Sequence, residues 1–384
     1  MALQDLAPLF YWTGYQRVKA IIQKGNKQRF DSKKQGEKMK TLKLFVLFVF
    51  GLTLFGCSLN TFYVEREIEK NLSRFNYEIL KDGKLHVILV GSGGPMKNPE
   101  RLPTCTAIIA GGEFILVDLG AGTIRNADLQ NLPLGNLSAV FITHFHSDHI
   151  SDLGEANFWS LAMGRTKTLE VFGPEVIKDV VDGYNLAYKY DTSYRIAHHG
   201  HHGADFFPPD ACVPVAKTVR LAEADGAELF FDRNGLKAYA FRVDHSPATP
   251  SYGYRFEYKG NVVVISGDTK KIDNLTKHAR NADIFICEGM RMELVKRTSD
   301  YAKKTGRQRI GKLLFDTMDY HIDPVDAGKV AKEATVKKLV FNHIVPPVTN
   351  FLTKKIFLDG VDDVYDGDIV MGEDGMEFIL EPKR

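Results

Sequence analysis

Short apolar runs alternate with longer amphipathic stretches from about residue 84 to the end of the chain. Apolar runs that end in turn residues predict strands, and two of them, CTAIIA and EFILVDL, are joined at Gly111–Gly112 in a predicted hairpin. The segments SDLGEANFWSLAMG, VIKDVVDGYNLAYKYDTSYR and DPVDAGKVAKEA predict helices, the last with Pro324 early in its first turn. The turn GSGGP after the first strand lacks the GxGxxG spacing and the Walker lysine, so it predicts a tight turn. This alternation predicts a layered α/β domain.

The hydrophobic pattern near the N-terminus differs from this alternation. Residues 39–57, MKTLKLFVLFVFGLTLFGC, begin with Lys40 and Lys43 and continue as an apolar run that is too short for a comfortable membrane span but suits a signal peptide. The ending LFGC resembles a bacterial lipobox, which implies lipidation at Cys57. The alternatives are an uncleaved anchor helix and an ordinary signal of a secreted or periplasmic protein. We therefore expect an exported protein that is lipid-anchored to a bacterial membrane.

These features divide the chain. We expect residues 1–38, which are basic and have no clear core pattern, to be an upstream extension of the reading frame, 58–83 to be a tether and 84–384 to be the folded domain. The net charge of +2 gives no electrostatic signature of nucleic-acid binding. The four cysteines are scattered and form no CxxC pair, so a zinc ribbon is excluded.

Ligand-type side chains gather at the ends of predicted strands. Four separate strands end at His144, at Asp244–His245, at Asp268 and at His343. In an open α/β sheet the carboxyl ends of strands are where sites are built, so four such endings imply that these side chains converge. The segment THFHSDH adds three further candidates, which are His146, Asp148 and His149.

Imidazole and carboxylate groups are the donors that zinc prefers, and a catalytic zinc keeps one position open. Seven candidate ligands are too many for one ion but suit two, and two metals can stabilise both the attacking and the leaving oxygen of a hydrolysed ester. We therefore predict two Zn²⁺ ions, with Mn or Fe as possible replacements.

The segment THFHSDH resembles the HxHxDH motif of the metallo-β-lactamase superfamily, and FILVDLGAGT, VDHSPATPSYGYRFE, ISGDTKK and FNHIVPP resemble its other blocks in the family's order. The resemblance covers about residues 84–350. It implies a four-layer αββα sandwich in which Asp118 orients the ligand loop. It also implies one zinc on His144, His146 and His245, a second on Asp148, His149 and His343, and Asp268 as the bridge.

The branch resembles the ribonuclease Z, arylsulfatase and phosphodiesterase group. DYHIDPVDAGKVA is similar to the block whose histidine donates a proton, here His321, and FICEGM is similar to the block whose Glu288 orients that donor. The resemblance implies that Asp148 and Asp268 position a metal-bridging hydroxide. Members that process tRNA carry a long basic arm between the third His block and the bridging Asp, but here a hairpin alone separates His245 from Asp268. The missing arm and the signal peptide both predict that tRNA is not a partner.

These observations predict a binuclear zinc-dependent phosphodiesterase that acts on a small-molecule ester. The alternatives are an arylsulfatase-like sulfate ester hydrolase and a ribonuclease Z-like endonuclease. An iron-dependent redox member of the superfamily and a non-catalytic binding lipoprotein rank below these two. The segment AHHGHHG is interpreted as a substrate-facing loop that carries His198, His199, His201 and His202. An adventitious metal tract and a solvated loop are the alternatives for this segment.

Overall fold

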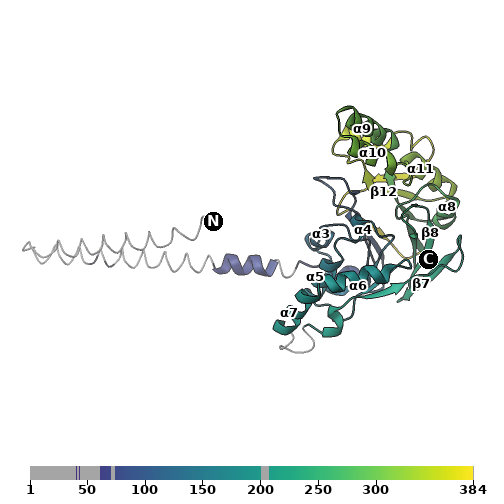
Figure 1. Ribbon diagram of the computed structural model, residues 1–384. Coiled ribbons are helices and arrows are strands. Elements are labelled where there is room, and N and C mark those ends of the chain that lie inside the picture. The colour runs from purple at the N-terminus through teal and green to yellow at the C-terminus, as the bar shows by residue number, and fades with distance from the viewer. Residues whose placement is uncertain (1–39, 41–42, 44–60, 71–73, 200–206, 384) are drawn as a thin grey trace, which may run out of the picture. The chain divides into compact units, whose positions relative to one another are not determined.

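The computed structural model describes residues 40, 43, 61–70, 74–199 and 207–383 (Figure 1). The chain divides into two compact units, Met1–Arg74 and Phe75–Arg384. In the first unit residues 61–70 are helical. Most of the predicted signal peptide, including Cys57, lies outside the described residues. Within the described part of the chain no helix is both long and apolar enough to cross a membrane.

The folded domain begins earlier than the expected boundary at residue 84. Ile79 and Leu80, in the short 3-10 helix Glu78–Leu80, are buried and pack in the core beneath the first sheet. Asp82 accepts a hydrogen bond from His86 in the first strand. The second unit accordingly starts at Phe75, and the last part of the predicted tether belongs to the domain.

Two seven-stranded sheets form the centre of the domain, in the orders β14-β1-β2-β3-β4-β5-β6 and β13-β12-β11-β10-β9-β8-β7. The first sheet contains β1 Leu85–Gly91, β2 Cys105–Ala110, β3 Glu113–Val117, β4 Leu137–Phe141, β5 Glu170–Gly173, β6 Val215–Thr218 and β14 Glu377–Leu380. The second contains β7 Ala227–Arg233, β8 Leu236–Val243, β9 Ser251–Tyr258, β10 Asn261–Ile265, β11 Ile284–Met290, β12 Lys338–Val345 and β13 Asp368–Met371. Each sheet joins an antiparallel part to a parallel part, because β3–β6 and β10–β13 pair in parallel.

Both faces of the inner strands are covered, which is why β1, β2, β3 and β11 read as nearly continuous apolar runs. In β1, Leu85, Val87 and Leu89 point into the core between the two sheets, whereas Ile88 and Val90 point into the core on the outer face. The inner core also contains Tyr254 and Phe256 of β9 and Val340 of β12, so it is built by both sheets together. Alternate side chains along one strand therefore pack in two different cores.

Helices cover the two outer faces. Over the first sheet lie α3 Thr123–Leu129, α5 Leu153–Ala162 and α6 Ile177–Ala187, whose buried residues join that outer core. Over the second lie α8 Asp273–Ala279, α11 Pro324–Glu333 and α12 Phe351–Leu358. Four further helices are α4 Ser147–Ile150, α7 Lys189–His199, α9 Met292–Lys304 and α10 Gln308–Thr317. The order helix, sheet, sheet, helix confirms the predicted αββα sandwich.

Local signals account for several elements. The predicted hairpin is present, because Gly111 and Gly112 both adopt positive φ and Thr106 pairs with Val117. The predicted helix at Pro324 is α11, whose first turn is capped by the Asp323 side chain accepting from the Val325 amide. Helices α9 and α10 were not predicted, and their buried residues Val295 and Leu314 pack with Val345 of β12.

Candidate metal centre

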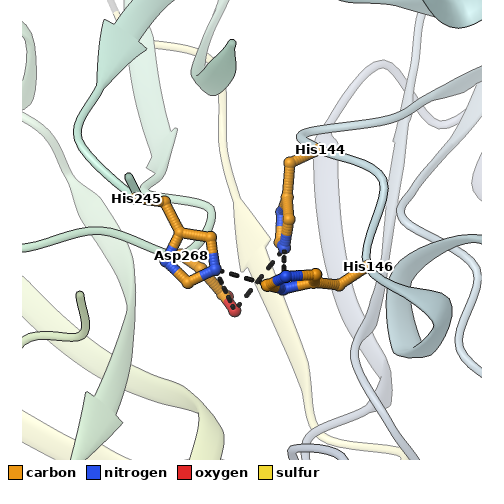
Figure 2. A group of neighbouring side chains, drawn as sticks. All are labelled: His144, His146, His245 and Asp268. Atoms are coloured by element: carbon orange, nitrogen blue, oxygen red, sulfur yellow. Dashed lines mark hydrogen bonds and ion pairs between the residues drawn. The ribbon is translucent and has the colours of Figure 1, made fainter. Parts of the chain in front are cut away.

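Four of the predicted ligands converge from three connections (Figure 2). His144 and His146 lie in the loop after β4, His245 follows β8 by two residues and Asp268 follows β10 by three. His146 Nδ1 lies 3.1 Å from His144 Nε2 and 3.2 Å from His245 Nε2. Asp268 Oδ2 lies 3.8 Å from the Nε2 atoms of both His144 and His245.

A second group forms beside the first. Asp148 and His149 belong to the short helix α4, and His343 belongs to β12. Asp148 Oδ2 lies 3.1 Å from His343 Nε2 and 3.6 Å from His149 Nε2. Asp268 takes part here too, because its Oδ2 lies 3.3 Å from His343 Nε2 and 3.4 Å from His149 Nε2. The same carboxylate oxygen therefore borders both groups.

These donor sets fit two metal ions. A tetrahedral zinc bound at about 2.0–2.2 Å keeps its donor atoms roughly 3.3–3.6 Å apart. The distances above, 3.1–3.8 Å in the first group and 3.1–3.6 Å in the second, bracket that value. His149 Nε2 is buried and has no hydrogen-bond partner among the described residues, as expected for a lone pair reserved for a cation.

His343 reaches the centre through a β-bulge. The predicted strand end at this residue is wrong, because β12 continues to Val345. Glu288 of β11 lies opposite Asn342 and Gly289 lies opposite Ile344, so His343 is the unpaired extra residue. Its φ is +45°, a region that costs a non-glycine residue about 1–3 kcal/mol, and its amide donates to Asn342 Oδ1 instead of to a strand. Gly94 closes the site on that side, since a Cβ there would lie 3.3 Å from His343 Cε1 and 2.6 Å from Val345 Cγ2.

Asp118, the residue predicted to orient the ligand loop, contacts that loop at two residues, Thr143 and His149. It also has positive φ, +59°, and its carboxylate accepts from the Thr143 amide at 2.8 Å and from the Thr143 hydroxyl at 2.9 Å. Its Oδ2 lies 2.9 Å from His149 Nδ1. A carboxylate that accepts from Nδ1–H leaves Nε2 free as a donor to metal.

A similar contact orients His245. Its Nδ1 lies 2.9 Å from the backbone carbonyl of Tyr320, which fixes the ring and directs Nε2 to the centre. Tyr320, Thr143 and Thr269 are site residues that sequence reasoning missed. Each is the immediate neighbour of a predicted residue, and that position in the sequence could have suggested it. The carbonyl contact of Tyr320 could not be predicted from the residue type, because every residue has a backbone carbonyl.

The charges of the centre are strongly coupled. Burial lowers the pKa of His245 to about 4 and also lowers that of His144. Burial acts in the same sense on His343, but the charge of Asp268 and the hydrogen bond with Asp148 outweigh it and raise the pKa of His343 to about 9. For Asp148 burial alone would raise the pKa, but the contact with His343 lowers it to about 2. Cations that bind here would therefore displace protons.

His321 and Glu288 form a buried pair at the edge of the centre. His321 Nδ1 lies 2.9 Å and 2.8 Å from the two oxygens of Glu288, and Glu288 Oε1 accepts from the Thr269 amide at 2.7 Å. His321 Nδ1 is also 3.9 Å from Asp268 Oδ2, which places the pair next to the shared carboxylate. Burial raises the pKa of Glu288, against the opposing charge of His321.

The described part of the segment AHHGHHG, residues 197–199, is not brought to the centre. His198 and His199 form the last turn of α7, so the prediction of a loop at these residues is wrong. His198 Nδ1 lies 3.4 Å from His199 Nδ1, and the His199 ring packs 5.6 Å from that of Phe207. Neither histidine belongs to the candidate ligand groups found among the described residues. His201 and His202 lie outside the described residues.

Comparison with known proteins places this geometry in a family. Residues 114–344 match the model of the β-lactamase superfamily domain. The chain belongs to the metallo-β-lactamase superfamily. It is 33% identical over 267 residues to ribonuclease Z of Mycobacterium bovis BCG Pasteur, covering 69% of this chain and 87% of that protein. It is 31% identical over 264 residues to ribonuclease Z of Mycobacterium tuberculosis H37Ra, covering 69% and 87%.

Solved structures show the same fold. The metallo-β-lactamase fold protein YhfI of Bacillus subtilis superposes with a TM-score of 0.56 at 18% identity, covering 77% of this chain and 99% of that one. The short form of human tRNase Z superposes with a TM-score of 0.54 at 20% identity, covering 77% and 99%. With these relatives, the protein is a metal-dependent hydrolase. The ribonuclease Z relatives also count against the prediction that tRNA is not a partner, and that prediction is withdrawn.

Proposed function

We propose that this protein is a binuclear zinc-dependent phosphodiesterase. The observation that carries the proposal is the position of Asp268, whose Oδ2 lies 3.3–3.8 Å from donor nitrogens of both ligand groups. Two donor sets around one shared carboxylate oxygen fit two cations better than one. We assign His144, His146 and His245 to the first, Asp148, His149 and His343 to the second, and Asp268 to both.

When bound, two divalent cations would supply positive charge to the scissile group and a nucleophile from water at neutral pH. The chain positions the rest. His146 is exposed and Asp148 is partly exposed, whereas the other ligands are buried, so the substrate approaches from the side of these two residues. His321 protonates the leaving oxygen, and Glu288 holds its Nδ1–H so that Nε2 carries the transferred proton. Asp148 and Asp268 position the attacking nucleophile.

The name ribonuclease Z, carried by the similar proteins, supports a phosphodiester over a sulfate ester as the scissile bond. Our first candidate is a small phosphodiester. Between His245 and Asp268 the chain forms only β9, β10 and short turns. The second candidate is endonucleolytic cleavage of RNA, favoured by the 33% identity to ribonuclease Z.

The test combines metal analysis with three parallel assays. Purified protein is expected to hold two zinc ions per chain and to hydrolyse bis(4-nitrophenyl) phosphate but not 4-nitrophenyl sulfate. A precursor tRNA with a 3′ trailer is the third substrate. Sulfatase activity alone would reject the proposal in favour of an arylsulfatase, and tRNA cleavage without turnover of the small ester would favour the second candidate.

Variants locate the activity. Asp268→Asn is expected to reduce the metal content and to abolish hydrolysis, because it weakens a ligand to both ions. Asp326→Asn is the matched control, since this carboxylate is on the surface of α11 and pairs with Lys329 at 2.7 Å. An Asp268→Asn protein that still holds two metals would remove the basis of the shared bridge.

A further inference from the structure

Helices α9 and α10 form a hairpin between Glu288 and His321. Val295, Ser299 and Ala302 of α9 are buried, as are Gly311 and Leu314 of α10. The Ser299 hydroxyl donates to the Gly311 carbonyl at 2.6 Å, which holds the two helices close together. The buried residues therefore form a narrow seam, and most of the surface of each helix lies outside it.

One flank of the hairpin attaches to the domain. Met292 at the start of α9 and Met318 after α10 pack against a cluster that contains Met290 and Val345, together with Met96. Lys303 lies three helical turns after Met292, on the same side of α9, and its ammonium group sits 4.6 Å from the centre of the Phe315 ring. We call this side the attached flank.

The other flank is apolar and uncovered. Tyr301, Ile310 and Leu313 are 65%, 52% and 63% exposed. Ile310 and Leu313 lie one turn apart on the same side of α10, and Tyr301, two residues before Lys303, points away from the attached flank of α9. The two helices are antiparallel neighbours, so these three side chains share one side of the hairpin. We call this side the free flank.

The hairpin is also cationic. Residues 292–317 hold seven basic side chains (Lys296, Arg297, Lys303, Lys304, Arg307, Arg309 and Lys312) and three acidic ones (Glu293, Asp300 and Asp316). The net charge of the hairpin is thus +4, which is 7 minus 3, in a chain whose total is +2. All three acidic groups are already paired, to Arg297, Lys296 and Lys312. Outside the attached flank, Lys304, Arg307 and Arg309 form no ion pair with any carboxylate of the described residues.

We propose that the free flank docks on the surface of an anionic lipid bilayer. A helix with aromatic and aliphatic side chains on one side and lysine and arginine around them has the composition of a segment that lies in the membrane interface. A second copy of the chain is a poor occupant, because it would bring a charge of +4 against +4. RNA would neutralise the cations but would leave Ile310 and Leu313 uncovered, so the apolar half of the surface favours lipid.

The experiment measures local insertion in the full chain. Leu313→Cys carries an environment-sensitive fluorophore, in a background of Cys57→Ser. The three other cysteines, at 105, 212 and 287, are buried and free. Gln308→Cys is the matched control, because this residue is exposed on the same helix but points away from Leu313 by more than a third of a turn. Both proteins contain the same apolar N-terminal run, so any tethering by that run affects them equally.

With vesicles of phosphatidylglycerol and phosphatidylcholine, the label at 313 is expected to shift to the blue and to brighten several-fold, while the label at 308 changes little. Pure phosphatidylcholine vesicles or high salt should suppress the response, because the cations contribute to binding. Adding Ile310→Ser to the Leu313→Cys protein should reduce it at least several-fold. Equal responses of the two labels, no response to anionic vesicles, or a response to single-stranded RNA in place of vesicles would overturn the proposal.

Discussion

Replacing Glu288 with glutamine tests the proposed proton donor directly. The side chain keeps its size but loses its charge, in a residue that is 3% exposed. In the native protein both oxygens lie within 2.9 Å of His321 Nδ1, and Oε1 also accepts from the Thr269 amide. A glutamine can still accept from that amide, but its NH₂ group then faces Nδ1, so His321 must accept there and loses the adjacent negative charge.

The size of the effect follows from electrostatics and from proton transfer. Two unit charges about 4 Å apart interact by about 4 kcal/mol at an effective dielectric constant of about 20. This energy is an upper limit for the interaction of Glu288 with a protonated His321 at the edge of an open site. A positioned general acid contributes about 10²–10⁴-fold in rate. We therefore expect Glu288→Gln to lower kcat/KM by about 10²–10³-fold, or about 3–4 kcal/mol, for a substrate whose leaving oxygen must be protonated.

The assay compares two leaving groups. Hydrolysis of a dinucleotide expels an alkoxide, which must be protonated as it leaves. Hydrolysis of bis(4-nitrophenyl) phosphate expels a stabilised phenolate, which needs the proton far less. The loss on bis(4-nitrophenyl) phosphate is therefore expected to stay below about tenfold. Glu377→Gln is the matched control, because Glu377 also contacts a histidine, with Oε1 2.7 Å from His86 Nδ1, on strand β14.

Two results would refute this reasoning. Equal losses on both substrates would mean that Glu288 does not act through leaving-group protonation. Loss of metal from the Glu288→Gln protein would mean that the pair belongs to the ligand set, which the nearness of His321 Nδ1 to Asp268 Oδ2, 3.9 Å, makes a real alternative. Metal content is therefore measured on the same preparations as the kinetics.

Three further predictions concern other parts of the chain. Asp118→Asn, which weakens the orientation of a proposed ligand, should lower metal affinity about 10–100-fold in a competition titration with a chelator, and unchanged affinity would contradict that role. Burial alone would raise the pKa of Asp283, but its bonds with Lys383 and Lys337 lower the pKa below the ordinary 3.8. The ionised Asp283 therefore stabilises the fold above that pH. This stabilisation is lost as the pH falls through the lowered pKa. Asp283→Asn should therefore cost about 1–3 kcal/mol in a denaturant melt at pH 7 and progressively less below pH 4, whereas a pH-independent difference would contradict the assignment. The mature protein is predicted to begin at a lipidated Cys57, and mass spectrometry that finds an upstream peptide on the mature chain would contradict this.

The sequence by itself predicted the layered fold and the side chains that meet at the candidate metal centre. Strand patterns and glycine turns are local, so the hairpin at Gly111–Gly112 and the helix at Pro324 could be read from neighbouring residues. Histidine and aspartate at strand ends are informative because few other roles need them there. Those residues were predicted to converge, and the structure brings all seven together.

Tertiary structure decided how these residues are aimed. His343 enters the centre only because β12 bulges against β11, a register that no local pattern specifies. His245 is oriented by the carbonyl of Tyr320, 75 residues away, and a carbonyl is present in every residue type. His198 and His199 carry the same ligand chemistry, yet they end helix α7 and belong to neither ligand group. Residue type limits what a side chain can bind, but long-range packing determines which side chains meet.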